Sequence, residues 1–212
     1  MRPVRRAMLR TFFFCFLGAS LQALLPLIAR DLLSGDARSF GLMLGAFGIG
    51  AVSGVFLLQS LREKVGNERT VKLCSFVLAL SIFLLSLSRS MWLDLIFLLT
   101  AGMAWMIANT TISITVQLFV PRWVMGRAIA TTSACTTLGI ALGSWLWGVV
   151  AVQYGLVIAL QVSALMLLVS LLLGKLIPVA DRTSSTELDD KVLNDPEVLL
   201  PITGRSGPIC IE

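Results

Sequence analysis

The sequence predicts an all-α membrane protein with six transmembrane helices, and three observations lead to this fold class. Hydrophobic residues make up 57% of the 212 residues and charged residues only 14%, whereas soluble domains carry about 25% charged residues. The mean hydropathy is +0.89. Six long apolar segments fill most of the chain, and each approaches the roughly 20 residues that a helix needs to cross a bilayer core.

The six apolar segments define a membrane domain over residues 1–178. We expect its helices at residues 11–29, 39–61, 70–88, 91–119, 128–150 and 156–177. The first segment follows four arginines, as a secretory signal does, but it is longer than the about 7–15 residues of a signal core and is therefore read as a spanning helix. Pro26 is expected to bend this helix, because proline cannot donate a hydrogen bond to the carbonyl four residues back.

The positions of lysine and arginine predict the topology. Twelve of these residues up to Arg182 fall on one side of the membrane and only Arg30, Arg38 and Arg89 fall on the other. Positive residues are retained in the cytoplasm during insertion. We therefore expect both termini of this multi-pass membrane protein in the cytoplasm.

The tail after the last helix differs in composition from the membrane domain. Residues 179–206 are acidic and polar, as in a solvated cytoplasmic linker. Residues 207–212 begin with Gly207-Pro208 and then alternate, which is typical of a turn leading into a strand. This pattern predicts the start of a soluble domain that the chain does not complete, and the chain is expected to be a fragment truncated at both ends.

Glycine is distributed unevenly among the predicted helices, and its distribution repeats. The second and fifth helices are rich in glycine, whereas the third has none and the sixth has glycine only at its ends. Helices two and five therefore occupy matching places in two successive three-helix repeats, an arrangement common in secondary transporters. Small residues four apart let helices approach closely in lipid. The glycines expected at such contacts are Gly45, Gly50, Gly54, Gly139 and Gly143.

Polar residues at membrane depth predict a substrate cavity, because amides and hydroxyls are costly to leave in a dry apolar environment. One stripe on the fourth helix has the spacing i, i+4, i+8, a second lies on the fifth helix, and one amide lies near the middle of the first. Interhelical hydrogen bonding or bonding to the residues' own backbone is the alternative role. The cavity candidates are Gln22, Asn109, Ser113, Gln117, Thr132 and Thr136.

Asp94 is the one carboxylate near a helix body in the predicted membrane domain. It lies one turn inside the fourth helix, after Ser90, which is a suitable N-cap residue. Its charge can favour the positive end of the helix dipole. The alternative is a role in proton coupling or gating.

Several function classes are excluded or disfavoured by composition. The chain has no histidine, and its four cysteines are far apart, so no metal-ligand spacing is present and no metal or other cofactor is expected. No Ser/His, paired-aspartate or metal constellation points to an enzyme. A nucleic-acid partner would need a basic face on a water-soluble domain, which this composition does not provide.

Two loops with glycine and flanking charges lie on the predicted cytoplasmic side. The first contains Glu63, Lys64, Gly66 and Arg69, and the second contains Arg122, Gly126 and Arg127. In such loops, opposite charges and helix dipoles can hold neighbouring helices together on one side of the membrane. Simple anchoring of helix ends at the membrane surface is the alternative.

At these loops the chain resembles the carboxy-terminal half of a major facilitator superfamily transporter. The segment Glu63-Lys64-Val65-Gly66 with Arg69 is similar to that superfamily's Asp-Arg-x-Gly-Arg loop, although Glu63 replaces the aspartate and Gln59 replaces an opening glycine. The loop from Val120 to Ala128 is similar to the one before the eleventh helix in a bacterial branch that includes the enterobactin exporter and related efflux proteins. The resemblance implies one half of a twelve-helix fold whose first, second, fourth and fifth helices here line a central cavity.

The function expected from sequence is therefore a secondary active transporter that exports a small, siderophore-like or drug-like molecule by alternating access. Its partners would be the lipid bilayer, the substrate, and a missing amino-terminal six-helix half or a second copy. The alternative is a non-transporting six-helix scaffold or the remnant of a truncated gene.

Overall fold

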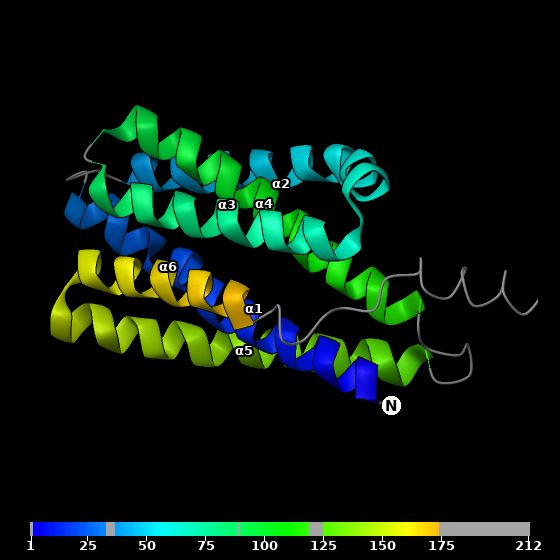
Figure 1. Ribbon diagram of the computed structural model, residues 1–212. Helices are drawn as coiled ribbons and strands as arrows, with labels where there is room; N and C mark the ends of the chain where they lie inside the picture. The colour runs from blue at the N-terminus through cyan, green and yellow to red at the C-terminus, as the bar shows by residue number, and fades with distance from the viewer. Residues whose placement is uncertain (1, 33–36, 89, 119–124, 174–212) are drawn as a thin grey trace, which may run out of the picture. The chain divides into compact units, whose positions relative to one another are not determined.

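The protein is an all-α membrane protein in its computed structural model (Figure 1). The structure describes residues 2–32, 37–88, 90–118 and 125–173. Within them run the α-helices α1 (Arg2–Leu27), α2 (Ala37–Val65), α3 (Asn67–Leu87), α4 (Met91–Leu118), α5 (Met125–Tyr154) and α6 (Leu156–Leu173), and a π-helix η1 (Ile28–Leu32) that follows α1. The expected linker 179–206 and the expected domain start 207–212 lie outside the described residues.

Five helices have the length and apolar composition to cross a membrane, and α6 is a shorter apolar helix. α1 begins well before the expected start at Thr11 and includes the arginine-rich segment. Pro26 lies inside α1, one residue before the α-helix gives way to η1. This change fits the loss of a backbone donor at proline, which removes one α-helical hydrogen bond.

Two turns depend on glycine. Gly66 connects α2 to α3 with φ 84°, and Gly155 connects α5 to α6 with φ 93°. Residues with a side chain rarely adopt positive φ, so glycine suits both positions. The turns are tight, because each joins two helices through a single residue, and each therefore sets two helices antiparallel.

The helices pack in a pattern that repeats. α2 lies along α4, and α5 lies along α1 (Figure 1). α3 packs on α4, α6 packs on α1, and α3 and α6 pack on each other. If α1 is matched with α4, α2 with α5 and α3 with α6, the α2–α4 pair corresponds to the α5–α1 pair, and the α3–α4 pair corresponds to the α6–α1 pair. The α3–α6 pair corresponds to itself. The structure thus has the contact pattern of two related three-helix units.

Two hydrogen bonds between helices connect equivalent pairs of this pattern. Ser20 on α1 donates to the Ser163 hydroxyl on α6 at 2.9 Å. The hydroxyls of Ser81 on α3 and Thr100 on α4 lie 3.0 Å apart. Hydroxyl pairs of this kind stabilise helix contacts in lipid by about 1 kcal/mol each.

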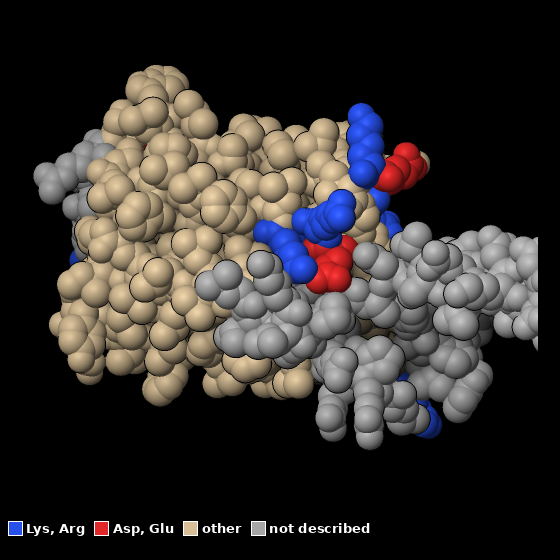
Figure 2. All heavy atoms as spheres, viewed as in Figure 1, with Lys and Arg blue, Asp and Glu red and all other residues tan. Residues whose placement is uncertain are grey.

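Charged side chains gather at one end of the bundle, where α2 turns into α3 (Figure 2). In the same view, the described residues on the surface between the two ends of the bundle are uncharged. Lys72 pairs with Glu68 there, and the guanidinium Nε of Arg62 donates to Asn67 at 3.0 Å. An uncharged band between charged ends is the surface that a bilayer requires, and the chain is an integral, multi-pass membrane protein.

Candidate functional site

The candidate site lies along the seam between α1 and α4. Two close helix contacts, of α2 on α4 and of α5 on α1, flank this seam. On α2, a Cβ at Gly54 would lie 3.0 Å from the Met103 carbonyl oxygen of α4, and one at Gly50 would collide with the Leu99 carbonyl. On α5, a Cβ at Gly139 would lie 2.8 Å from the Phe12 carbonyl oxygen of α1, and one at Gly143 would collide with that of Phe16. The two contacts repeat the same four-residue spacing on each helix. Glycine is thus what allows α2 to reach α4 and α5 to reach α1.

The fifth glycine expected at a close contact has different surroundings. No atom lies within 4 Å of a Cβ at Gly45, which is exposed on the open side of α2. A close contact that the sequence did not predict is made by Gly102 on α4, where a Cβ would collide with the Phe47 carbonyl of α2.

An aromatic contact marks where α1 and α4 meet. The Trp105 ring of α4 covers Gly18 of α1, where any Cβ would collide with it. The same ring stacks on Phe14 with centroids 5.3 Å apart. On the other side of α1, the indole N–H of Trp147 donates to the Phe16 carbonyl at 3.1 Å, which adds a polar contact between α1 and α5. The middle of α1 is therefore held from both sides.

A polar cluster lies on one side of the Trp105 contact and joins three helices. The Cys15 thiol of α1 donates to the Asn109 side-chain oxygen of α4 at 3.4 Å, and the Thr136 side chain of α5 also interacts with this thiol. The Asn109 amide nitrogen donates to the Trp105 carbonyl at 3.3 Å. Asn109 and Thr136 are half-buried. This arrangement brings together two of the residues expected to line a cavity, and Cys15 was not among those expected.

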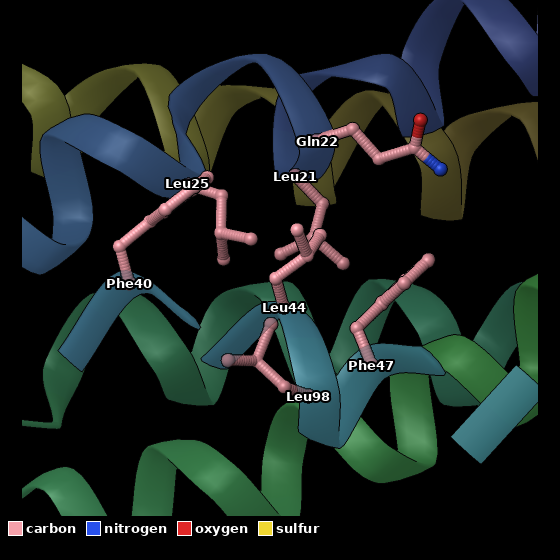
Figure 3. Close-up of a pocket in the computed structure, with 7 residues that line it drawn as sticks. All are labelled: Leu21, Gln22, Leu25, Phe40, Leu44, Phe47 and Leu98. Carbon is pink, nitrogen blue, oxygen red and sulfur yellow. The ribbon is translucent and has the colours of Figure 1, made fainter. Parts of the chain in front are cut away.

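An apolar pocket of about 260 Å³ lies between α1 and α2, on the other side of the Trp105 contact. Its lining residues are Leu21, Gln22, Leu25, Phe40, Leu44, Phe47 and Leu98. Figure 3 shows the α1 and α2 side chains pointing toward one another, with the Gln22 carboxamide extending along α1 at the rim. Gln22 is the one polar side chain of the lining, and it is exposed. Such a site suits an apolar group with few hydrogen-bonding atoms.

The other three cavity candidates, Ser113, Gln117 and Thr132, differ in their surroundings. Ser113 is half-buried and Gln117 is exposed, and both continue the Asn109 stripe along α4. Thr132 is buried, and its hydroxyl donates to the Ala128 carbonyl of its own helix at 2.8 Å. Thr136 likewise donates to the Thr132 carbonyl at 3.0 Å. Both threonine hydroxyls thus bond the backbone of their own helix, which is the alternative to lining a cavity. Of the two, only Thr132 is also buried.

Asp94 lies in the first turn of α4, and its backbone N–H donates to the Ser90 carbonyl at 3.1 Å. Its side chain is only 1% exposed. Among the described residues, neither carboxylate oxygen has a hydrogen-bond partner. The nearby Ser88 hydroxyl bonds the N–H and carbonyl of Ser90 instead, at 3.2 and 3.4 Å. A carboxylate this buried normally has a partner.

The first loop is described, whereas the second is described in part. Glu63 and Lys64 are exposed at the end of α2, and the Gln59 amide donates to Glu63 at 3.0 Å within that helix. Thr70 donates to the Gly66 carbonyl at 2.7 Å and so closes the turn before the exposed Arg69. Gly126 and Arg127 are exposed in the first turn of α5, and Arg122 lies outside the described residues. In the described residues, these hydrogen bonds of the first loop lie within α2, α3 and their turn.

The residues that sequence reasoning missed are apolar or small. Phe40, Leu44 and Phe47 form one wall of the pocket. Their spacing of four and three residues places them on one face of α2, and this spacing could have been recognised in the sequence. Trp105 precedes Asn109 by one turn on the same face, so it extends the predicted stripe. Among the described residues, no group of three His, Cys, Asp or Glu side chains is placed to hold a metal ion.

Comparison with known families identifies the chain. The model of the family described as transmembrane secretion effector, MFS_3, matches residues 1–212. No curated protein matches the chain. Because the family model covers the whole sequence, the chain belongs to the transmembrane secretion effector family of major facilitator transporters.

Proposed function

We propose that this protein is a secondary active transporter that exports a small molecule by alternating access, without a cofactor and without catalysis. The observation that carries the proposal is the seam between α1 and α4. At membrane depth this seam holds a polar cluster around Asn109, and an apolar pocket beside Gln22 adjoins it between α1 and α2, with Leu98 of α4 in its lining. Polar side chains at this depth mark helix contacts or a substrate path, and Asn109 contacts Cys15 at the edge of this seam. Membership in a transporter family supports the same conclusion.

We further propose that the six helices act as one half of a twelve-helix unit. Only 22% of the most apolar stretch of α2, and 22% of that of α5, is buried inside the structure, whereas 61% of that of α1 is buried. Their open faces mix large apolar side chains, such as Phe56 and Val152, with small and hydroxyl-bearing residues. They carry glycines, such as Gly41 and Gly48 on α2, and hydroxyls, such as Thr131 and Thr137 on α5. Small and hydroxyl-bearing residues favour contact with other helices or with water rather than with lipid tails.

The partner would be an amino-terminal six-helix half, on the same or another polypeptide, or a second copy of this chain. Assignment as the carboxy-terminal half is supported by two resemblances. The loop at Gly66 is similar to the superfamily's Asp-Arg-x-Gly-Arg loop, and the loop at Gly126 is similar to the one before the eleventh helix in the enterobactin exporter branch. The excess of basic residues at the α2–α3 end supports a cytoplasmic location for that end and for both termini, in a bacterial inner membrane.

The role of the cavity is tested with Asn109→Leu. We expect this variant to insert normally and to lower export by about tenfold, because a hydrogen-bonding group at the substrate site is lost. The matched control is Gln161→Leu, which removes the same kind of amide from the groove between α3 and α6. Cells carrying the wild type, either variant or a deletion are compared by the small molecules in their medium and by their sensitivity to a panel of toxic compounds.

Either result is informative because the two variants remove similar amides. Loss of export with Asn109→Leu but not with Gln161→Leu supports transport through the α1–α4 seam. Identical profiles for the wild type and the deletion would contradict the proposed function and favour a non-transporting scaffold.

A further inference from the structure

The apolar pocket and the polar cluster occupy equivalent places in the two three-helix units. The close contacts fix the alignment, because Gly50 and Gly54 on α2 meet α4 as Gly139 and Gly143 on α5 meet α1. Their carbonyl partners Leu99 and Met103 on α4 correspond in the same way to Phe12 and Phe16 on α1. Every other residue of these four helices can then be aligned by counting along its helix.

Under this alignment the two amides coincide. Gln22 comes six residues after Phe16, and Asn109 comes six residues after Met103. Each is the amide that its helix contributes to the seam, one beside the apolar pocket and the other in the polar cluster. The pseudo-symmetry therefore relates two sites that are each built around one amide.

The burial of the aligned residues agrees with this register. Five of the seven residues that line the apolar pocket have a counterpart in the same burial class. The agreeing pairs are Leu21 and Ala108, Leu25 and Ile112, Leu98 and Thr11, all buried; Leu44 and Ser133, both exposed; and Phe47 and Thr136, both half-buried. The alignment thus relates most of the two surfaces as well as the glycines. The two remaining pairs differ: Gln22 is exposed and Asn109 half-buried, and Phe40 is half-buried and Ile129 exposed.

The two sites nevertheless differ in chemistry. Leu44 and Phe47 of the apolar pocket are replaced by Ser133 and Thr136 in the counterpart, and buried Leu98 is replaced by Thr11. The counterpart site also holds the Cys15–Asn109 hydrogen bond. No charged residue belongs to either set of lining residues in the described chain. One scaffold therefore presents an apolar site and a neutral hydrogen-bonding site.

From these mirrored sites we infer the substrate class: an uncharged amphipathic molecule whose apolar part occupies the pocket of Phe40, Leu44 and Phe47 and whose hydrogen-bonding part reaches Asn109, Ser133 and Thr136. The inference rests on the proposed transport function. Cys15 and Gln22 are seven residues apart on α1, which is about 10 Å along the helix. A molecule of that length has the reach to contact both sites if it passes beside the Trp105 side chain that lies between them. This half of the transporter disfavours an anion, because neither lining supplies a counter-charge in this low-dielectric environment.

The test uses the protein expressed from its own locus and transferred into lipid nanodiscs with any partner still bound. The probe is N-phenyl-1-naphthylamine, an uncharged fluorophore with two apolar ring systems and one N–H donor. The comparison probe is 1-anilinonaphthalene-8-sulfonate, which has the same skeleton and a negative charge. Saturable fluorescence above that of protein-free nanodiscs measures binding. We expect the neutral probe to saturate and the sulfonate to bind at least about tenfold more weakly.

Variants in the two sites then show whether both contribute. Leu44→Ser is expected to weaken binding of the neutral probe about tenfold by removing apolar contact, and Ser133→Leu severalfold by removing a hydrogen-bonding group. Leu165→Ser, in the groove between α3 and α6, is the matched control and is expected to leave binding within about twofold.

Three results would overturn the inference: no saturable binding of the neutral probe, equal affinity for the sulfonate, or site variants that behave like Leu165→Ser. The proposed function fails in a different way, because it fails when export does not depend on Asn109 whatever the probe does. Binding that follows the predicted pattern in a protein without export would support the sites and contradict transport.

Discussion

Asp94 presents two opposite expectations at the scale of a single residue. Its position in the first turn of α4 lets a negative charge interact favourably with the helix dipole. Its burial without a hydrogen-bond partner among the described residues makes the same charge costly. Desolvating a buried charge costs several kcal/mol, whereas a favourable interaction with the helix dipole contributes about 0.3–1 kcal/mol at an exposed position. The cost is therefore the larger effect.

We accordingly predict that Asp94→Leu raises the free energy of unfolding by about 1–4 kcal/mol, as replacement of buried charges by apolar groups of similar volume often does. Asp94→Asn, which keeps the shape and removes the charge, is expected to fall between the two proteins. Thermal unfolding in detergent measures the effect. A lower melting temperature for Asp94→Leu would mean that the carboxylate stabilises the start of α4.

The polar residues of α4 and α5 show which roles can be predicted from sequence and which cannot. The spacing of Asn109, Ser113 and Gln117 was sufficient to predict one face of α4, and the structure places Asn109 against Cys15, which also interacts with Thr136. Periodicity cannot tell whether a hydroxyl bonds its own helix, as those of Thr132 and Thr136 do. That choice depends on the neighbouring helix. The role of these residues in a cavity stays a prediction.

At the scale of helices, glycine position decides which pairs touch. Gly50 and Gly143 are each pressed against a carbonyl of the neighbouring helix, whereas Gly45 and Gly148 have no neighbour within 4 Å of a Cβ. All four belong to helices that the sequence marked as rich in glycine. The sequence could indicate which helices pack closely, but the contacting face depends on how the helices are arranged around each other, which spacing alone does not determine.

These four glycines give a matched prediction. Gly50→Ala and Gly143→Ala force a methyl group into a backbone carbonyl and are expected to lower stability by roughly 1–3 kcal/mol. Gly45→Ala and Gly148→Ala meet open space and are expected to be neutral or to stabilise by up to about 1 kcal/mol through helix propensity. Melting temperatures of the four variants provide the comparison. Equal effects at all four positions would contradict the close packing of α2 on α4 and of α5 on α1.

At the scale of the molecule, the fold class was predictable because apolar length and low charge leave few alternatives in a bilayer. The pairing of α2 with α4 and of α5 with α1 was not predicted, since contacts between distant helices depend on three-dimensional arrangement. That pairing leaves α2 and α5 at the open sides of the bundle. The open sides are the reason to expect a partner.

We predict that native mass spectrometry of the protein extracted from its own membrane shows this chain of 22.9 kDa in a complex, or as part of a polypeptide, with six further transmembrane helices. The driving interaction is helix packing by small residues on the open faces of α2 and α5. Thr137→Phe, on the open face of α5, is expected to weaken the complex, and Leu165→Phe, on α6, is the control. A stable six-helix monomer would contradict this arrangement.

Alternating access requires that the α1–α4 seam open in turn to each side of the membrane. The most direct measurement is the labelling of Ser133→Cys by a membrane-impermeant maleimide, applied separately from each side, in a protein whose native cysteines are replaced. Leu165→Cys in the α3–α6 groove serves as the control. Alternating access predicts that Ser133→Cys is labelled from both sides and that Leu165→Cys is labelled from neither. Labelling of Ser133→Cys from one side alone would contradict the account.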